Sequence, residues 1–463
     1  MYRVTIINDG VETVIHSEVN TKDSPTLSDG TIKQAINKID TFSFTILPNN
    51  PGYELIRPLR TLIKVLNTKT GKIEFEGRVL FPKESMDSDG LFGKSFVCES
   101  ELGYLNDSCQ RHGEYHDISV REFLEIIIEN HNKDVAGDPI DKTFVVGEVT
   151  VSTSTGRIYR YLGYEPTFDT IKDKLLDRLG GELRIRKKDG VRYLDYVESF
   201  GEVKNTEIRL AKNLISIEKE VDATEVITRL VPLGTQIESE DEAATDASPA
   251  RLTIEEVNDG KDYLVDEETE KAIGTIIVKS HVWDDITLPE NLKARGEEYL
   301  RENNRAKVKH EISFLDLYLI NLDPDSVDLG NWYPVINPVM GINEVLRVVE
   351  KNINVISPEN GSISVGDLFK TMSEYQSETN KTTQRIVDLE SRISRQSLTI
   401  RGLRNELKEV DEAVENVNKA IEEMDIDALN EAIVILEQAI QNLQEAIEQI
   451  PSYVPATPEK DGL

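Results

Sequence analysis

Cysteine and histidine are scarce in this chain of 463 residues, which holds two cysteines and six histidines. Cys98 and Cys109 are too few for a disulfide scaffold, and nothing in the sequence requires them to pair. His112 and His116 have a metal-like spacing, but a zinc-protease pattern needs Glu directly after the first His, where this chain has Gly113. We therefore expect a surface loop here, and no metal or other cofactor.

Long hydrophobic runs are missing. No apolar run approaches the roughly 20 residues that a membrane-spanning helix needs. Residues 1–12 also lack the basic start and apolar core of a signal peptide. We expect no membrane span, and synthesis in the cytoplasm without export by the ordinary secretory route. This does not exclude that the protein ends up outside the cell as part of a particle.

Positive charge is in deficit, because 53 Lys and Arg stand against 85 Asp and Glu, a net charge of −32. Proteins that hold nucleic acid neutralise its phosphates with Lys and Arg, so this balance argues against specific nucleic-acid binding. An acidic surface repels DNA and favours solubility. The same total also fits an ordinary solvated surface.

Catalytic motifs are absent as well. The sequence has no G-x-S-x-G, Walker loop or dinucleotide fingerprint. Gly180 and Gly181 suit a helix stop, and Cys98 lies in a strand-like stretch where a buried small side chain is usual. Acidic pairs such as Asp284–Asp285 are common in so acidic a chain and carry no information. We identify no catalytic, cofactor-binding or metal-binding residue and expect a structural protein, not an enzyme.

What the sequence does contain is a long β-rich region. Within a first β-domain at 1–100, Phe42, Phe44 and Ile46 alternate with polar residues, the pattern of a half-buried strand. Two further strands flank a turn at 67–71. The period of two therefore predicts that these three apolar side chains point into a core.

Helical signals enter in an α+β domain at 101–210. Ser119 is an N-cap with Glu122 three residues later, the capping-box spacing. A second helix has one apolar face, made by Phe168, Ile171, Leu175 and Leu179. Gly180 and Gly181 end it, and the sequence KKDG then turns a hairpin between 183–186 and 191–196.

The rest of the β-rich region divides into two parts. Strand patterns at 211–235 and 307–366 predict a second β-domain. Between them, 236–306 reads as an inserted α+β domain that starts with an acidic surface loop. Within the insertion we expect short strands over 251–287 and a helix that begins at Pro289. The fold class is multidomain, β-rich α+β.

A heptad pattern follows at 367–424 and predicts a coiled coil of about 85 Å at a rise of 1.5 Å per residue. Its seam consists of Leu368, Met372, Tyr375, Thr379, Thr382, Ile386, Leu389, Ile393, Gln396, Ile400, Leu403, Leu407, Val410, Val414, Val417, Ile421 and Met424. No other segment supplies a matching partner, so we expect self-association. The mixture of β-branched and Leu seam residues does not fix the number of strands.

The heptad phase slips near 425–428 and the seam continues to residue 450. Either one extra residue is absorbed in a continuous rod, which we favour slightly, or Asp427 caps a second helix after a turn. A turn would make a helical hairpin. Residues 451–463 follow Pro451 as a flexible tail or a short docking peptide.

Several segments resemble a known family. Residues 39–80 look like the first domain of tail-hub proteins from bacteriophages of Gram-positive hosts, a family that includes phage minor structural proteins, tail-associated lysins and prophage endopeptidase tail proteins. Residues 168–197 resemble its second domain, and 251–278 and 341–367 resemble the segments that close its hub module. The resemblance covers roughly 1–370 and rests on spaced patterns, not on a catalytic motif.

The resemblance implies two tube-like β-barrel domains per subunit and a homotrimer that caps a sixfold tail tube at the virion tail tip. It implies contacts with distal tail or tail tube proteins and with tail-tip or receptor-binding proteins. The coiled coil would continue on the trimer axis, and genome DNA would pass through an acidic lumen.

One departure from the family concerns its lytic domain. Members called lysins carry a C-terminal Cys-His peptidase or zinc metallopeptidase, whereas residues 371–463 contain no Cys or His. We therefore do not expect that chemistry there. The alternatives are a tail-associated peptidoglycan endopeptidase with a cryptic activity, or the hub of a phage-derived contractile particle.

Overall fold

The computed structural model describes residues 2–19, 21, 24–86, 88, 90–153, 156–237, 250–283 and 286–367, and residues 408, 410, 412, 414 and 433–442. The chain divides into two compact units. The first contains 1–232, 257–281 and 293–369, and the second contains 233–256, 282–292 and 370–463.

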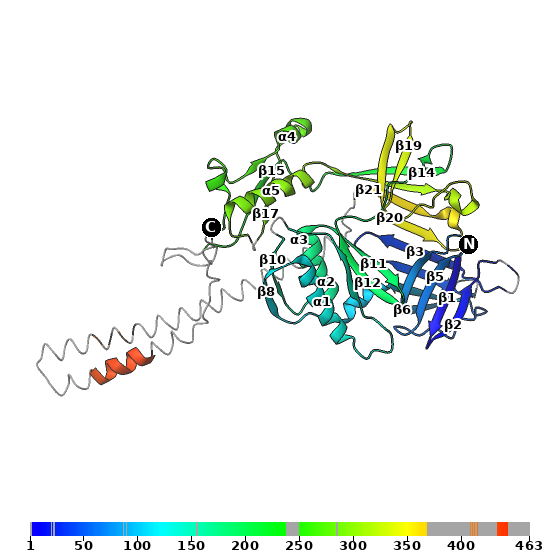
Figure 1. Ribbon diagram of the computed structural model, residues 1–463, viewed down its shortest axis with the longest axis horizontal. Helices are drawn as coiled ribbons and strands as arrows, with labels where there is room; N and C mark the ends of the chain where they lie inside the picture. Colours follow the sequence, from blue (N-terminus) through cyan, green and yellow to red (C-terminus); the bar gives the residue numbers. More distant parts are fainter. Residues whose placement is uncertain are drawn as a thin grey trace, which may run out of the picture. The chain divides into compact units, whose positions relative to one another are not determined.

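Most of the first unit is organised by a curled sheet of 13 strands (Figure 1). Its N-terminal part comprises β1 (Tyr2–Asn8), β2 (Val11–His16), β3 (Asp29–Ala35), β4 (Thr41–Ile46), β5 (Leu62–Asn67), β6 (Ile73–Met86) and β7 (Phe92–Ser100). Phe42, Phe44 and Ile46 are buried, so the predicted alternation is confirmed. The predicted turn lies between β5 and β6.

Strands from late in the sequence complete the same sheet. They are β13 (Ile208–Arg209), β14 (Leu214–Asp222), β18 (Lys307–Phe314), β19 (Trp332–Asn337), β20 (Ile342–Asn354) and β21 (Ser362–Gly366), with short 3-10 turns at Leu317–Ile320 and Pro358–Asn360. β20 pairs antiparallel with β3, and Ile353 lies opposite Ile32. The strand order is β14-β18-β21-β20-β3-β4-β7-β6-β5-β1-β2, with β19 beside β20 and β13. We call the strands β1–β7 the first β-half and β13, β14 and β18–β21 the second.

Between the two β-halves the chain forms an α+β segment. It contains a 3-10 helix (Glu101–Asp107), β8 (Gly113–Ile118), α1 (Val120–Asp134), β9 (Val145–Val149), β10 (Ile158–Leu162), α2 (Thr167–Ile171), a π-helical turn (Lys172–Leu176), α3 (Asp177–Leu179), β11 (Glu182–Lys188) and β12 (Val191–Val197). The capping box of Ser119 and Glu122 is confirmed, since each side chain accepts from the other residue's backbone N–H. The KKDG hairpin is confirmed as β11–β12.

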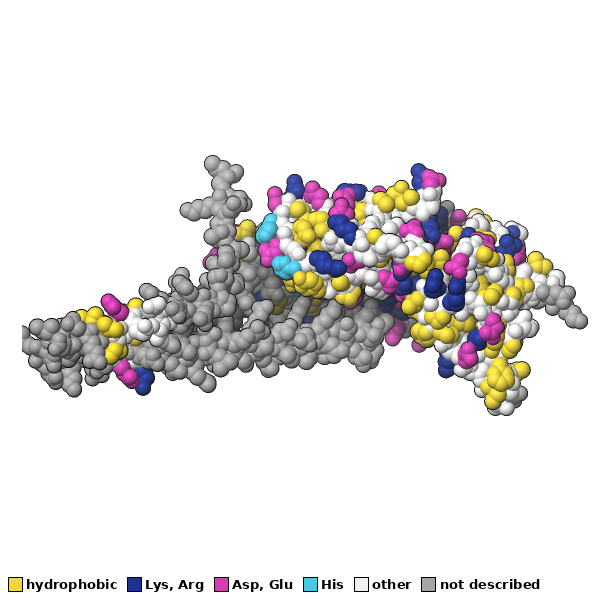
Figure 2. All heavy atoms as spheres, turned by 90° about the horizontal axis from the view of Figure 1, so that it is seen from below, with side chains coloured by type: hydrophobic (Ala, Val, Ile, Leu, Met, Phe, Trp, Pro, Cys, Tyr) yellow, Lys and Arg dark blue, Asp and Glu magenta, His cyan; other side chains and the backbone are white. Residues whose placement is uncertain are grey.

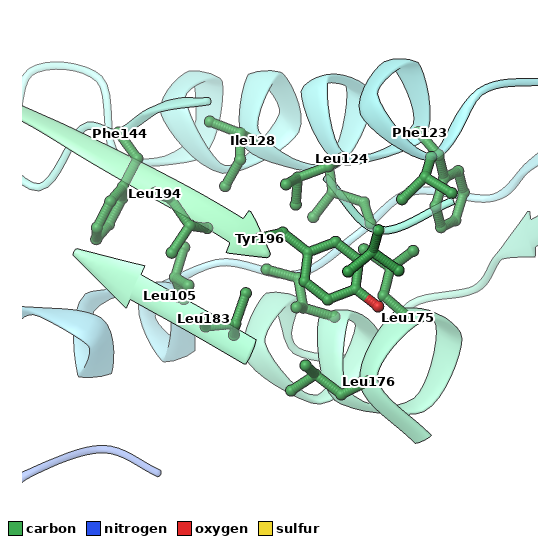
Figure 3. Close-up of a cluster of buried hydrophobic side chains, with 14 of the residues drawn as sticks. Leu105, Phe123, Leu124, Ile128, Phe144, Leu175, Leu176, Leu183, Leu194 and Tyr196 are labelled. Carbon is green, nitrogen blue, oxygen red and sulfur yellow. The ribbon is translucent and has the colours of Figure 1, made fainter. Parts of the chain in front are cut away.

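Side chains from both helical stretches and from β11 and β12 meet in the core of this segment (Figure 3). Leu124 and Ile128 come from α1, Leu175 from the second helical stretch, and Leu194 and Tyr196 from β12. The Tyr196 hydroxyl donates to the Gly180 carbonyl at 2.6 Å, which satisfies a carbonyl where the helix ends. The predicted helix stop at Gly180 is confirmed by its φ of 69°.

Two local predictions are wrong. Residues 113–118 are not a loop but β8, which pairs antiparallel with β10. The expected short strands over 251–287 include a helix, α4 (Glu267–Ile273). Asp266 caps it by accepting from Thr269 N–H at 2.9 Å, and Gly274 ends it at a φ of 77°. Both caps are visible in the sequence.

The remaining elements between residues 229 and 303 are a 3-10 turn (Glu255–Val257), β15 (Arg229–Leu233), β16 (Leu264–Val265), β17 (Val278–Val282) and α5 (Pro289–Asn303). The helix predicted to begin at Pro289 is confirmed. In the second unit, residues 433–442 are helical. The acidic loop at 238–249, the phase break at 425–428 and the tail at 451–463 lie outside the described residues.

Candidate assembly surfaces

A cluster of charges ties the two β-halves together where β3 meets β20. Lys351 on β20 is buried, and its Nζ lies 3.3 Å from Asp328 Oδ1 and 3.9 Å from Glu74 Oε2. Lys72 reaches the same two carboxylates, at 2.6 Å from Asp328 Oδ1 and 3.5 Å from Glu74 Oε2. We call Lys72, Glu74, Asp328 and Lys351 the charged joint.

Burial and attraction act in opposite directions on this joint. Burial alone would lower the pKa of Lys351, but the nearby carboxylates outweigh it, and the pKa is raised. Burial alone would raise the pKa of Asp328, but Lys351 and Lys72 outweigh it, and the pKa is lowered. Lys351 and Asp328 are therefore both held in their charged forms, as an ion pair within the second β-half.

A second tie joins the second β-half to the α+β segment. Arg347 on β20 forms a two-pronged ion pair with Glu182 at the start of β11, with Nη2 2.7 Å from Oε2. The same guanidinium donates to the Phe200 and Gly330 carbonyls at 2.7 and 2.9 Å. It also lies 4.5 Å from the centre of the Trp332 ring. A planar guanidinium suits this site because it can donate in several directions at once.

A cavity of about 730 Å³ lies within the first unit, lined by both β-halves and the α+β segment. Asp40, at the turn between β3 and β4, lines it and accepts from Ala35 N–H at 3.3 Å. Burial raises the pKa of Asp40 to about 7, against the opposing effects of Ala35 N–H and Lys72. The lining carries both Lys and Glu or Asp side chains, most of them paired with each other, so it is not a cleft of one charge sign.

Each β-half carries a hairpin whose end exposes apolar side chains. In the first half, Met86 and Phe92 at the end of β6–β7 are 61% and 56% exposed. In the second half, Val339 and Met340 in the turn of β19–β20 are 84% and 43% exposed. Exposed large apolar groups at the ends of hairpins are typical of contact surfaces.

The histidines and cysteines discussed from the sequence, His112, His116, Cys98 and Cys109, lie in β7 and in the α+β segment. His116 lies on β8 with its ring centre 4.2 Å from that of Tyr159, and His112 is exposed just before the strand. Cys98 is fully buried in β7, as predicted, and burial raises its thiol pKa well above the usual range. Both cysteines are free.

Within the described ranges, no group of three or more His, Cys, Asp or Glu side chains is arranged to hold a metal ion. None of the helices in that part of the chain combines the length and apolar character that crossing a membrane requires. On the face shown in Figure 2, acidic and basic side chains are interspersed with hydrophobic ones.

The coiled-coil seam is largely outside the described residues. Val410 and Val414 are described and helical. The other predicted seam positions, Leu368, Met372, Tyr375, Thr379, Thr382, Ile386, Leu389, Ile393, Gln396, Ile400, Leu403, Leu407, Val417, Ile421 and Met424, fall where no structure is described. In the continued seam, Ile433 and Ile440 lie on the helix at 433–442 and are exposed.

The fold is shared with prophage tail proteins. A 43 kDa tail protein of prophage MuSo2 from Shewanella oneidensis has a TM-score of 0.53 at 12% identity, covering 79% of this chain and 100% of that one. The prophage tail protein gp18 from Listeria monocytogenes has a TM-score of 0.50 at 14% identity, covering 82% and 99%. A tail protein from Neisseria meningitidis has a TM-score of 0.51 at 12% identity, covering 79% and 96%.

Residues 202–376 match the family model described as prophage endopeptidase tail. That range includes the whole second β-half and is less than half of the chain. No curated protein sequence matches the chain significantly. The resemblance to prophage tail proteins is thus confirmed at the level of the fold. The family description includes endopeptidase, but the described residues form no cluster that could hold the metal ion of a metallopeptidase.

Proposed function

We propose that this protein is a structural hub at the tip of a bacteriophage or prophage tail. Three copies cap the tail tube and connect it to tip or receptor-binding components during host attachment and DNA ejection. The observation that carries the proposal is that one chain builds two β-halves, each with its own projecting hairpin, on one continuous sheet. The fold shared with prophage tail proteins supports it.

The two hairpins give the proposal a geometric basis. If each β-half presents one apolar hairpin end, three copies present six, which matches a sixfold tube. Met86 and Phe92 in one hairpin and Met340 in the other are of residue types that are enriched in protein interfaces. The charged joint and the Arg347–Glu182 pair hold the β-halves and the α+β segment in register within each copy.

The C-terminal heptads supply the trimer axis. In this proposal the seam from Leu368 to Met424 joins three chains in a rod below the hub. The exposure of Ile433 and Ile440 in the single chain is consistent with a partner helix covering them. An acidic lumen would let DNA pass without adhering, in keeping with the net charge of −32.

A tail-associated peptidoglycan endopeptidase is the second candidate, because the matched family model carries that word in its description. It predicts that purified cell walls clear when the protein is added, and that clearing is lost when His112 and His116 become Ala. The hub function predicts that neither the unaltered protein nor this variant clears cell walls. A hub of a phage-derived contractile particle would keep the same architecture and the same trimer.

The molar mass of the purified protein in solution tests the proposed hub. We would measure the whole chain and a version ending at residue 366 by light scattering during size exclusion. A hub with a rod gives a trimer for the whole chain, with a large hydrodynamic radius that falls on truncation. A compact monomer at both lengths would contradict the trimer and leave a tail-protein fold without this role.

A further inference from the structure

The two-stranded sheet of β8 and β10 has one buried face and one aromatic exposed face. Ile158 and Leu162 of β10 point into the core of the α+β segment. Between them in sequence, Tyr159 and Tyr161 point outward and are 43% and 50% exposed. Because side chains alternate along a strand, these two rings lie on the same face, with Cα atoms roughly 6.7 Å apart along the strand.

Each of the two rings is supported on one side by another side chain. The His116 ring centre lies 4.2 Å from that of Tyr159. The Lys174 Nζ lies 4.1 Å from the centre of the Tyr161 ring, and the Lys174 side chain is itself almost fully buried and paired with Asp173 at 2.9 Å. The two rings are thus held in place before any ligand arrives, which lowers the entropic cost of binding.

Polar groups surround the rings. Glu114 lies on β8 opposite Tyr161, and its carboxylate is 3.8 Å from His116 Nε2. Glu165 follows β10 and accepts from Gly163 N–H at 2.9 Å. Tyr164, 73% exposed, adds a further hydroxyl beyond the end of the strand. The two strands and the residues that follow β10 therefore present flat rings together with carboxylate, imidazole and hydroxyl groups.

This chemistry narrows the class of partner. Single-stranded nucleic acid also stacks on aromatic rings, but it needs a basic groove for its phosphates, and the carboxylates here would repel them. A protein partner that buried this face would also bury Glu114 and His116, which is costly without matching charges. A neutral sugar ring offers a flat C–H face for the tyrosine and hydroxyl groups for the surrounding acceptors and donors.

We propose that the outer face of β8–β10 binds a neutral saccharide chain, with Tyr159 and Tyr161 stacking on its pyranose rings. A row of rings along an extended strand suits an extended, flat chain. A β-1,4-linked pyranose chain has that form and carries its axial C–H groups on both ring faces. The inference does not depend on the proposed hub function.

Titration calorimetry of the full chain with fully N-acetylated chitohexaose and with cellohexaose, both neutral, tests this site. We expect binding of at least one β-1,4-linked probe, and weaker binding of maltohexaose, whose α-1,4 linkage curls the chain. The double variant Y159A/Y161A should bind about tenfold or more weakly, because the stacking surface is gone. The double variant Y159F/Y161F should retain most of the affinity, because the rings remain.

A matched control is F92A, which removes an equally exposed aromatic ring at the end of β6–β7 and should leave saccharide binding unchanged. Thermal unfolding of each variant checks that the fold is intact, as expected for exposed positions. No heat of binding with either β-1,4-linked probe at millimolar concentration would overturn the proposal. Equal binding by Y159A/Y161A and the unaltered chain would also overturn it.

Discussion

The ammonium group of Lys72 lies 2.6 Å from the carboxylate of Asp328, which is 256 positions further along the chain. Lys351 approaches the same carboxylate from β20. Two cations and two carboxylates therefore close the contact between the first and second β-halves. In a partly buried cluster of this kind, removal of one member leaves a charge without its partner, and that loss dominates the energetics.

The first prediction concerns Lys351. Replacing it with Met keeps the length of the side chain but leaves Glu74 and Asp328 with one cation in place of two. We expect the free energy of unfolding to fall by roughly 3–5 kcal/mol, measured by chemical denaturation at neutral pH.

Its control is K83M on the exposed outer part of β6, which should change the free energy by less than about 0.5 kcal/mol. If K351M were as stable as K83M, the joint would not hold the β-halves together.

The second prediction concerns pH and Asp40. Its pKa is raised to about 7 in the folded protein, mainly by burial. A raised pKa means that the folded state holds a proton that the unfolded chain has released. Between about pH 4 and pH 7 the folded protein should therefore lose stability as pH rises.

The variant D40N tests this, because an amide resembles the protonated acid and can still accept from Ala35 N–H. Denaturation midpoints at pH 5 and pH 8 should differ less for D40N than for the unaltered chain, and D40N should be the more stable protein at pH 8. The lowered pKa of Asp328 acts in the opposite direction, but it does so at lower pH, where the carboxylate becomes protonated. An identical pH profile for both proteins would count against a buried, titrating Asp40.

The third prediction concerns Arg347. The variant R347A removes the guanidinium from the Glu182 carboxylate, which keeps only the Phe200 N–H as a donor, and from two backbone carbonyls, so stability should fall by about 2 kcal/mol or more. R347K keeps the charge but loses the two-pronged pairing, and an intermediate effect is expected. R209A removes an exposed arginine and serves as the control, with a loss below about 1 kcal/mol. Equal stabilities for R347A and R209A would show that the tie is not structural.

Local elements could be read from the sequence where a short pattern suffices. The burial of Phe42, Phe44 and Ile46 follows from a period of two, and the start of α1 from the Ser119–Glu122 spacing. Capping residues also mark α4, with Asp266 at its start and Gly274 at its end. We predicted strands there because the apolar residues on either side of α4 are typical of strands. In each of these cases the deciding contacts lie within a few residues.

The charged joint could not be read in this way. Its ion pairs join positions up to 277 residues apart, and no local pattern brings them together. A β-bulge between Val348 and Glu350 also shifts the alternation of β20. Continuing from the buried Val348, a period of two would place Lys351 on the outer face, whereas the bulge turns Lys351 and Ile353 inward. A single extra residue thus decides which side chain is buried.

The fourth prediction concerns the hairpin ends and rests on the proposed hub. V339E and M86E place charges on the two apolar ends, and each should weaken binding to a tail-tube ring about tenfold or more without destabilising the fold. V11E alters a valine that is 67% exposed on β2 and is the matched control. Binding is measured by co-sedimentation with tube rings. If both hairpin variants bound as V11E does, the hairpins would not be the tube contact.

The last prediction concerns the coiled-coil rod and rests on the proposed trimeric hub. Ile400 and Leu403 are adjacent seam positions, and a seam position in a coiled coil faces the same seam in its partners. I400D/L403D therefore places several carboxylates side by side in an apolar seam, where their repulsion and loss of hydration oppose association. Light scattering should show a fall in mass from trimer towards monomer, while the thermal unfolding transition of the β-rich region stays unchanged. N405D introduces a carboxylate in place of an amide outside the seam, and this variant should remain trimeric. Wholesale aggregation of I400D/L403D, with loss of that unfolding transition, would mean that these residues pack inside a core and that the rod is wrong.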